Sequence, residues 1–402
     1  MLTYEKALQH VLQTVEPLTP QKHPLLEAAG LTLAEAVSSR WDMPRFDNSA
    51  MDGFAIADHP NEVKGSLEIV GTSYAGHPFA GAITSGQAIR ITTGAPLPGG
   101  ANTVIPIEDA VDQKTHVSLS NPALPGQHIR HQGEEFKAGD LMLEAGTQLR
   151  AGEIGLLACA GIEQVFACPK PRVAIISSGD ELVELGQTPG PGQIINSNLY
   201  LLMTRVRECG CLPIPMGIGQ DDPEALDNLI AEGMNTDLII STGGVSVGDR
   251  DHMHNALARR DFQQKFWKVA IKPGKPVLFG TLEDKPYFGL PGNPASTAAT
   301  FELFVKPALN RLSGQKDITP KKRTGVLATE VEGGGKRQSF LWCRLEWVDG
   351  EYQVTVPKRQ GSGQHRSIQG ANALLSIPVG TSKLHSGENV EVLLLETSIS
   401  VT

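Results

Sequence analysis

Apolar residues along this chain follow a helical period in some segments and form short strand-like runs in others. The period over residues 4–15 predicts an N-terminal helix, and a second short helix is expected near Leu31–Val37. From about Trp41 to Gly139, short apolar runs are separated by Gly and Pro, which predicts a separate β-rich unit. Residues 140–165 return to a helix-capable pattern, clearest at Ala151–Ala160. We expect that helix to pack on the N-terminal one, which would make the β-rich unit an insertion.

Strands and helices alternate from Arg172 onward. The expected strands are Val173–Ser177, Leu212–Ile218, Leu238–Ser241, Phe266–Ile271, Val277–Phe279 and Tyr287–Leu290. The expected helices are Leu199–Glu208 with Asn198 as its N-cap, one opening at Asp222-Pro223, one around His254–Arg260, and Ala295–Leu309. This order predicts an α/β domain with a mostly parallel sheet, whose binding site lies where strands end and loops begin.

Strand-like runs return after the polar, basic segment 313–323 and predict a further β-rich unit. The predicted fold class is therefore α/β plus β-rich domains in one elongated multidomain chain. The expected units are an N-terminal helical linking domain (1–40 and 140–170), an inserted β-rich domain (41–139), an α/β domain (171–315) and a C-terminal β domain (320–402).

Composition narrows the class of protein. The formal charge of −9 and the lack of a long basic stripe argue against a nucleic-acid partner. No window reaches the ~18 uninterrupted apolar residues of a membrane span, and the first residues lack the layout of a secretory signal. Five scattered cysteines, an odd number, favour reduced thiols over a disulfide framework. We therefore expect a soluble cytoplasmic protein.

The most informative segment is the Gly-rich run Ser241–Asp251, which directly follows the apolar Leu238–Ile240. A buried strand that ends in glycines and hydroxyls presents backbone N–H groups to a phosphate or another oxyanion. Asp251 could hold a hard cation against the same ligand. A turn with a purely structural role needs only one or two such small residues, so we favour an anion or nucleotide site.

Acidic residues recur at the ends of the predicted parallel strands. Glu181, Asp221 and Asp251 each follow a different strand and are expected to converge at one sheet edge, an oxygen-rich setting suited to Mg²⁺ and phosphate. Asp180 and Asp222 are better explained as turn and cap residues.

Three lysines and two short polar loops are further candidates. Lys268, Lys272 and Lys275 cluster beside Pro and Gly, with the first two on one face of an extended segment, as an anion site requires; a solvated strand edge is the alternative. Asp52 precedes Gly53, and Thr93 precedes Gly94, in segments that are either tight turns or reactive loops.

Six of these segments, in this order, resemble the molybdopterin molybdenumtransferase family (MoeA, related to the gephyrin E domain). The matching segments are Phe46–Ala55, Ile91–Pro96, Ser178–Leu182, Ser241–Asp251, Ala270–Pro276 and Gly289–Ser296. The resemblance implies an enzyme that inserts molybdate into adenylylated molybdopterin and releases AMP in a Mg²⁺-dependent step, forming molybdenum cofactor. It also implies a homodimer whose active site is shared between subunits, with molybdopterin adenylyltransferase and molybdoenzymes as candidate protein partners.

The resemblance assigns roles to individual residues. Asp52 and Thr93 would enter the site from the partner subunit's inserted domain, whereas Glu181, Asp221 and Asp251 would line the α/β cleft, with Asp251 and then Asp221 as Mg²⁺ ligands. The substrate-binding residues implied are Gly243, Gly244, Ser246, Lys268, Lys272, Lys275, Pro291, Gly292, Pro294, Arg344 and Ser362.

The chain departs from the family pattern in two places, one in a loop and one in a predicted strand. Glu135 stands where the family often has Asp, which leaves the role of the loop 130–135 open. Trp342 replaces a usual Arg, and Arg344, on the same face of the predicted strand, is the candidate substitute. Two alternatives to an insertase are a molybdopterin adenylyltransferase, which would need neither β-rich domain, and a non-catalytic scaffold, which would not need the acidic and Lys positions.

Overall fold

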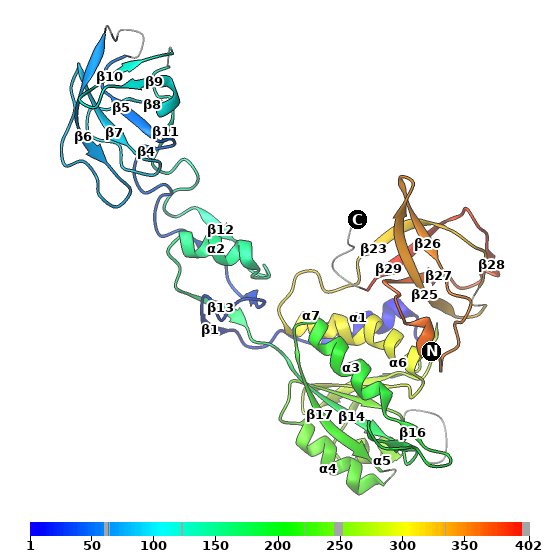
Figure 1. The fold of residues 1–402 in the computed structure, drawn as a ribbon. Helices are drawn as coiled ribbons and strands as arrows, with labels where there is room; N and C mark the ends of the chain where they lie inside the picture. Colours follow the sequence, from blue (N-terminus) through cyan, green and yellow to red (C-terminus); the bar gives the residue numbers. More distant parts are fainter. Residues whose placement is uncertain are drawn as a thin grey trace.

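The computed structural model describes residues 1–59, 63, 65–121, 124–220, 222–244, 252–333 and 335–395. The chain is elongated (Figure 1): a β-rich unit lies at one end, and an α/β unit lies beside a second β-rich unit at the other. A small unit built around α2 (Ala151–Cys159) connects the two ends. The predicted fold class is confirmed. Within the described residues, no helix combines the length and apolarity that a membrane span requires.

The inserted unit is built on a six-stranded sheet with the order β8-β5-β7-β6-β10-β9. Its strands are β5 (Gly53–Ile56), β6 (Ser66–Ser73), β7 (Gln87–Ile91), β8 (Thr103–Pro106), β9 (Ala110–Asp112) and β10 (His116–Leu119), with a 3₁₀ turn η2 (Ile107–Asp109) and a pair β4 (Asn48–Ser49) with β11 (Ile129–Arg130). Phe54 and Ile56 of β5 pack on one side of the sheet, and Ala55 packs on the other. Both faces are therefore covered, as the continuous apolar strands of the sequence require.

An ion pair between strands of the inserted unit makes its stability pH-dependent. Arg90 of β7 donates to both carboxylate oxygens of Asp112 in β9, one of them at 2.7 Å. The hydrogen bond from Arg90 lowers the pKa of Asp112 from 3.8 to about 2. The carboxylate thus stabilises the fold above the unfolded-state pKa, and this contribution is lost as the pH falls through about 2.

We expect Asp112→Asn to lower the unfolding temperature of this unit at neutral pH, because the charged acceptor of Arg90 is lost. The difference from the unsubstituted protein should shrink below pH ~4 and vanish near pH ~2. Thermal melts across this range measure it. Glu68→Gln, on the neighbouring strand, is the control, since Glu68 is exposed and has no ion pair among the described residues. A deficit for Asp112→Asn that does not change with pH contradicts the assignment.

The connecting unit contains short strands and one helix. Its elements are a sheet of β1 (Gln21–Pro24), β13 (Gln164–Cys168) and β2 (Thr32–Leu33), a pair β3 (Val37–Ser38) with β12 (Leu141–Leu143), and α2. Leu157 of α2 packs on Leu33, Leu149 and Val165. The expectation that this helix packs on the N-terminal helix is wrong, because its apolar face is used locally. The helix expected at Leu31–Val37 is also wrong, since that segment forms β2 and β3.

The α/β unit has a six-stranded sheet of order β17-β14-β18-β22-β21-β19. The first four strands are parallel, β21 runs antiparallel to β22, and β19 runs antiparallel to β21, so five of the six strands share one direction and the expected mostly parallel sheet is confirmed. The strands are β14 (Arg172–Ser178), β17 (Leu212–Gly219), β18 (Leu238–Thr242), β19 (Gln263–Trp267), β21 (Leu278–Leu282) and β22 (Lys285–Leu290), with a side pair of β15 (Leu182–Val183) and β16 (Ile194–Ile195). The helices are α3 (Ser197–Glu208), α4 (Pro223–Gly233), α5 (His252–Ala258), α6 (Pro294–Thr300) and α7 (Lys306–Leu312).

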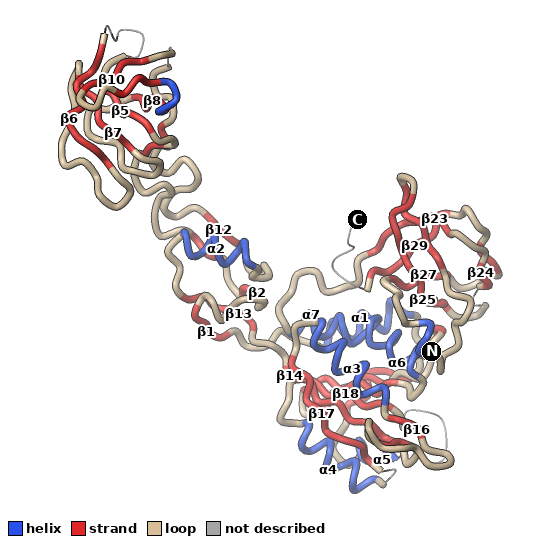
Figure 2. The backbone as a smooth tube through the Cα atoms, in the orientation of Figure 1, coloured by secondary structure: helices blue, strands red, loops and turns tan. Residues whose placement is uncertain are grey.

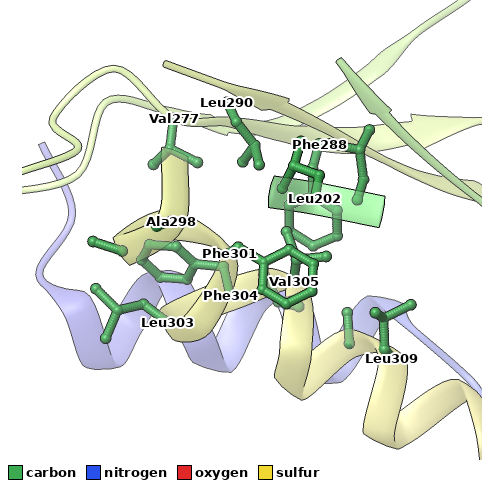
Figure 3. Packing of buried hydrophobic residues seen from close by; sticks show 14 of the residues in the cluster. Leu202, Val277, Phe288, Leu290, Ala298, Phe301, Leu303, Phe304, Val305 and Leu309 are labelled. Carbon is green, nitrogen blue, oxygen red and sulfur yellow. The ribbon is translucent and has the colours of Figure 1, made fainter. Parts of the chain in front are cut away.

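Helices cover both faces of this sheet (Figure 2), and the larger core lies on the α3 side. The N-terminal helix α1 (Tyr4–Thr14) lies alongside α7, and its buried residues join that core. Figure 3 shows Phe301 and Phe304 packed between the helices and the sheet residues Phe288 and Leu290. The helix expected from Ala295 to Leu309 is continuous in direction but contains a π-helical segment, η3, at Phe301–Val305.

The C-terminal unit is a closed five-stranded barrel, in which β25 pairs with β26 and β27 and the ring continues through β23 and β29. Its strands are β23 (Lys322–Leu327), β25 (Gln338–Val348), β26 (Glu351–Thr355), β27 (Ala373–Ile377) and β29 (Asn389–Leu394), with a pair of β24 (Val331–Glu332) and β28 (Lys383–Leu384) and a 3₁₀ turn η4 (His365–Ser367). One more strand, β20 (Ile271–Lys272), reaches across from the α/β unit and pairs with the start of β25.

Candidate active site

A cleft of about 600 Å³ lies at the carboxyl ends of the parallel strands, where the sequence placed the site. Its walls come from the loops after β14, β18 and β22, from the start of α3, and from the C-terminal unit. Most of its polar side chains carry oxygen: Ser178, Glu181, Asn196, Ser197, Asn198, Thr242 and Asn293.

Two glycines at the end of β18 form the wall of the cleft that the sequence indicated most strongly. Gly243 and Gly244 have φ of +84° and +61°, backbone conformations that favour glycine. A Cβ on Gly243 would stand 2.3 Å from the carbonyl oxygen of Ser178, so the two strand ends approach too closely for any side chain. Gly243 N–H donates to the Leu290 carbonyl, at 3.3 Å. The turn thus links three neighbouring strand ends.

Among the described residues that line the cleft, Glu181 is the one with an acidic side chain. Its carboxylate folds back over Gly179, where a Cβ would stand 2.5 Å from Oε2, and the φ of Gly179 is +148°. The loop therefore holds the carboxylate close to the end of β14. Ser246, Asp221 and Asp251, the other predicted residues of these loops, lie outside the described residues.

The loop after β22 provides the opposite wall. Pro291, Gly292 and Pro294, three of the candidate substrate-binding residues, all line the cleft. The Asn198 amide donates to the Gly292 carbonyl at 2.7 Å and fixes this loop against α3. Asn198 is therefore not the N-cap of α3: the helix begins at Ser197, and Asn196 precedes it.

The C-terminal unit contributes one edge of the cleft through the loop 361–367. The Ser362 carbonyl accepts a hydrogen bond from the Ala295 N–H at 2.9 Å, and Asn293 donates to the Ser362 hydroxyl at 3.4 Å. His365 Nε2 lies 3.0 Å from the Ser197 hydroxyl, and His365 lines the cleft.

Arg344 does not line this cleft. It is exposed on β25 and donates to the Gly370 carbonyl at 3.0 Å. Trp342 shares its face of the strand but is buried in the core next to α1.

None of the three predicted lysines lines the cleft; Pro276, next to Lys275, does line it. Lys272 and Lys275 are exposed. Lys268 has a φ of +70°, which ends β19, and its Nζ lies 3.6 Å from the centroid of the Trp267 ring. The expectation that Lys268 and Lys272 share one face of an extended segment is wrong, because Lys268 follows the α/β sheet and Lys272 belongs to the barrel edge.

Asp52 and Thr93 lie together in the inserted unit. The Asp52 carboxylate accepts from the Thr93 N–H at 2.7 Å and from its hydroxyl at 3.1 Å. Both residues are exposed. The inserted unit and the α/β cleft lie at opposite ends of the elongated molecule (Figure 1). One subunit therefore does not bring all the predicted residues together.

Sequence reasoning missed a group of amides and hydroxyls that line the cleft. Asn196 is only 1 % exposed; its Oδ1 accepts from the Ser177 hydroxyl at 3.1 Å, and its Nδ2 has no partner in the described part of the chain. That amide nitrogen is itself buried behind the cleft lining. The sequence marks these residues only as a polar run, 196–198, which directly follows β16 and begins α3. His365 had no such local signal.

Comparison with known proteins supports the class that this fold and cleft define, a multidomain enzyme of the molybdopterin-binding type. The chain matches the MoeA N-terminal region (domain I and II) over residues 2–161, the probable molybdopterin binding domain over 174–311, and the MoeA C-terminal region (domain IV) over 324–395. The chain belongs to the MoeA family, the molybdopterin molybdenumtransferases.

Relatives and solved structures match over nearly the whole chain. A molybdopterin molybdenumtransferase from a Nostoc species is 39 % identical over 92 % of this chain and 88 % of its own length. The enzyme of that name from Haemophilus influenzae is 38 % identical over 98 % of each chain. A crystal structure of the molybdopterin biosynthesis MoeA protein from Pyrococcus horikoshii superposes with a TM-score of 0.82 at 30 % identity, covering 98 % of this chain and 100 % of that one.

Proposed function

We propose that this protein is a molybdenum insertase, which inserts molybdate into adenylylated molybdopterin and releases AMP to form molybdenum cofactor. The observation that carries the proposal is the Gly243–Gly244 turn at a cleft of about 600 Å³ in a chain that matches this family along its length. Curated relatives of nearly equal length are named molybdopterin molybdenumtransferase. The adenylyltransferase alternative is not favoured, because both flanking β-rich regions of the MoeA family are present.

The cleft offers donors suited to a polyanionic substrate. The backbone N–H of Gly244 and the exposed cations Lys272 and Lys275 can bind phosphate or molybdate oxygens. Because Gly363 and His365 of the C-terminal unit line one edge of the cleft, substrate binding depends on that unit as well. These groups bind, orient and stabilise charge as AMP leaves.

Magnesium is the proposed cofactor. The donor chemistry fits a hard cation, since the cleft lining is rich in oxygen and includes the Glu181 carboxylate. Asp251 and Asp221 would be its ligands; the described residues contain no cluster of three metal-binding side chains. Bound there, the ion would neutralise charge that develops on the anhydride oxygens.

A homodimer with shared sites is the proposed assembly. Asp52 and Thr93 are hydrogen-bonded to each other on an exposed surface that lies far from the cleft of the same subunit. A partner subunit would bring them to the cleft.

Molybdopterin adenylyltransferase and molybdoenzymes are the proposed protein partners. The proposed compartment is the cytoplasm, in keeping with five free cysteines. The domain limits proposed are those expected from the sequence, except that α1 is assigned to the α/β unit whose core it joins.

The proposed function is tested by incubating the protein with adenylylated molybdopterin, Mg²⁺ and molybdate, and by following AMP and protein-bound molybdenum. We expect AMP release that depends on molybdate, because anhydride cleavage is tied to insertion. Formation of adenylylated molybdopterin from ATP would instead indicate the adenylyltransferase. Absence of both reactions would indicate a scaffold. Asp251→Ala should block turnover without unfolding the protein, and unchanged AMP release would remove this residue from the mechanism.

A further inference from the structure

A second cavity of about 720 Å³ lies at the other end of α3 from the cleft. Ser197 and Asn198 at the start of α3 line the cleft. The residues at and just beyond the other end of α3 that line this second space are Arg205, Arg207, Glu208, Cys209 and Gly210. Its remaining walls come from the connecting unit, the π-helical segment, the linker 315–321 and the end of β29. We call it the junction cavity, because all three neighbouring units meet there.

The junction cavity is strongly basic although the chain carries a net charge of −9. Seven cationic side chains line it, against three carboxylates, Glu208, Glu302 and Asp317. The cations are Arg150, Lys170, Arg205, Arg207, Lys306, Lys316 and Lys321. Like charges around a concave surface repel one another and concentrate anions there.

One wall of the cavity is a buried charge network. Glu302 in the π-helical segment is 3 % exposed, and its carboxylate lies 3.3 Å from Arg205 Nε and 3.4 Å from Lys306 Nζ. Lys306 also donates to the carbonyl of Leu395. Because buried charges are costly unless paired, this network holds Arg205 and Lys306 in fixed positions at the cavity.

A purely structural role accounts for only part of the charge. Arg205 and Arg207 stand in the last turn of α3, where cations favour the helix dipole. Lys316 pairs with Glu144, and Lys321 pairs with Asp317.

Three cations from three different segments have no ion pair in the part of the chain that the structure describes, although the helix dipole favours the position of one of them, Arg207. No carboxylate of the described residues lies within ion-pairing distance of Arg150, Lys170 or Arg207. Arg150 is instead oriented by the Gln148 amide oxygen, at 3.1 Å and 3.3 Å. The helix dipole explains neither Arg150 nor Lys170, because neither is on α3.

We propose that the junction cavity binds a phosphate-type oxyanion, free or as a small phosphomonoester, with Lys170 and Arg207 as its main cationic contacts. Cations that lack a protein partner supply the charge-assisted hydrogen bonds such an anion needs. The volume is in the range of small-molecule sites. A bound anion bridges the connecting unit and α3. The proposal does not depend on the molybdenum chemistry of the cleft.

Calorimetric titration of the full-length protein with inorganic phosphate at low ionic strength tests the proposal, and glycerol phosphate in a parallel titration distinguishes the free ion from the ester. The unsubstituted protein should bind, and Lys170→Gln with Arg207→Gln should weaken binding about tenfold or more. Both residues are exposed, and neither belongs to the buried network, so the variant should fold.

Two further double variants separate this site from other cationic surfaces. Lys22→Gln with Arg323→Gln neutralises two exposed cations elsewhere and should leave the affinity unchanged. Lys272→Gln with Lys275→Gln weakens any binding in the cleft and should also leave this affinity in place. If the unsubstituted protein binds neither anion, or if only the Lys272/Lys275 variant loses binding, the proposal is overturned.

Discussion

Gly243→Ala is expected to reduce the rate of AMP release by about 10²-fold or more, because the strand ends around the cleft would have to separate. The new Cβ would stand 2.3 Å from the Ser178 carbonyl oxygen, which is rigid backbone. The φ of +84° adds a strain of ~1–3 kcal/mol for any residue with a side chain. Displacement of this turn moves its N–H groups away from the oxyanion they are proposed to bind.

Gly350→Ala is the matched control for this substitution. Gly350 has a similar φ of +91° in the β25–β26 hairpin, yet a Cβ there would meet nothing within 4 Å. The control should therefore lose some stability and keep its turnover rate. Steady-state AMP release and thermal melts of both variants separate the local displacement from general destabilisation. Equal turnover by the two variants would remove the Gly243 turn from the site.

Restoration of activity by mixing two inactive variants is the second large effect expected. Asp52→Ala and Glu181→Gln should each be nearly inactive, because each removes one side of the proposed shared site. In a mixed dimer, Glu181 of one subunit meets Asp52 of the other, so one of the two sites is intact. Dimers that contain one chain of each variant should therefore recover about half of full activity.

The recovery is measured as AMP release by co-purified chains carrying two different affinity tags. The control is the double variant Asp52→Ala, Glu181→Gln paired with the unsubstituted chain and purified in the same way. Each site of that mixed dimer lacks one of the two side chains, so it should be nearly inactive. Activity of the mixed single variants that stays at the level of either variant alone contradicts a site shared between subunits.

Local patterns sufficed for most of the secondary structure and for one wall of the cleft. The sequence predicted that Gly243 and Glu181 lie close together, because each follows a parallel strand and such strands have their carboxyl ends at one edge of the sheet. Both residues line the same cleft in the structure. The strand expected at Val173–Ser177 is β14, which is one residue longer at each end.

Features that depend on distant contacts were not predictable. The contact between Ser197 and His365 joins residues 168 positions apart, and no local pattern marks His365 as part of a cleft. The N-terminal helix packs in the α/β core and not on α2, because its partners are α7 and Phe340 far along the chain. The predicted extended segment Phe266–Ile271 fails at Lys268, whose positive φ is unusual for a residue other than glycine.

The short strand β20 belongs by sequence to the α/β unit and by hydrogen bonding to the barrel. Lys272 follows Ile271 in that strand, so a residue proposed to bind the substrate is positioned by a sheet from another unit. Phe340 and Trp342 of the barrel are also buried in the α/β core. The two units consequently share one hydrophobic core. A substitution that destabilises the barrel should therefore lower the rate of the reaction in the cleft, although the barrel core lies away from the glycine turn.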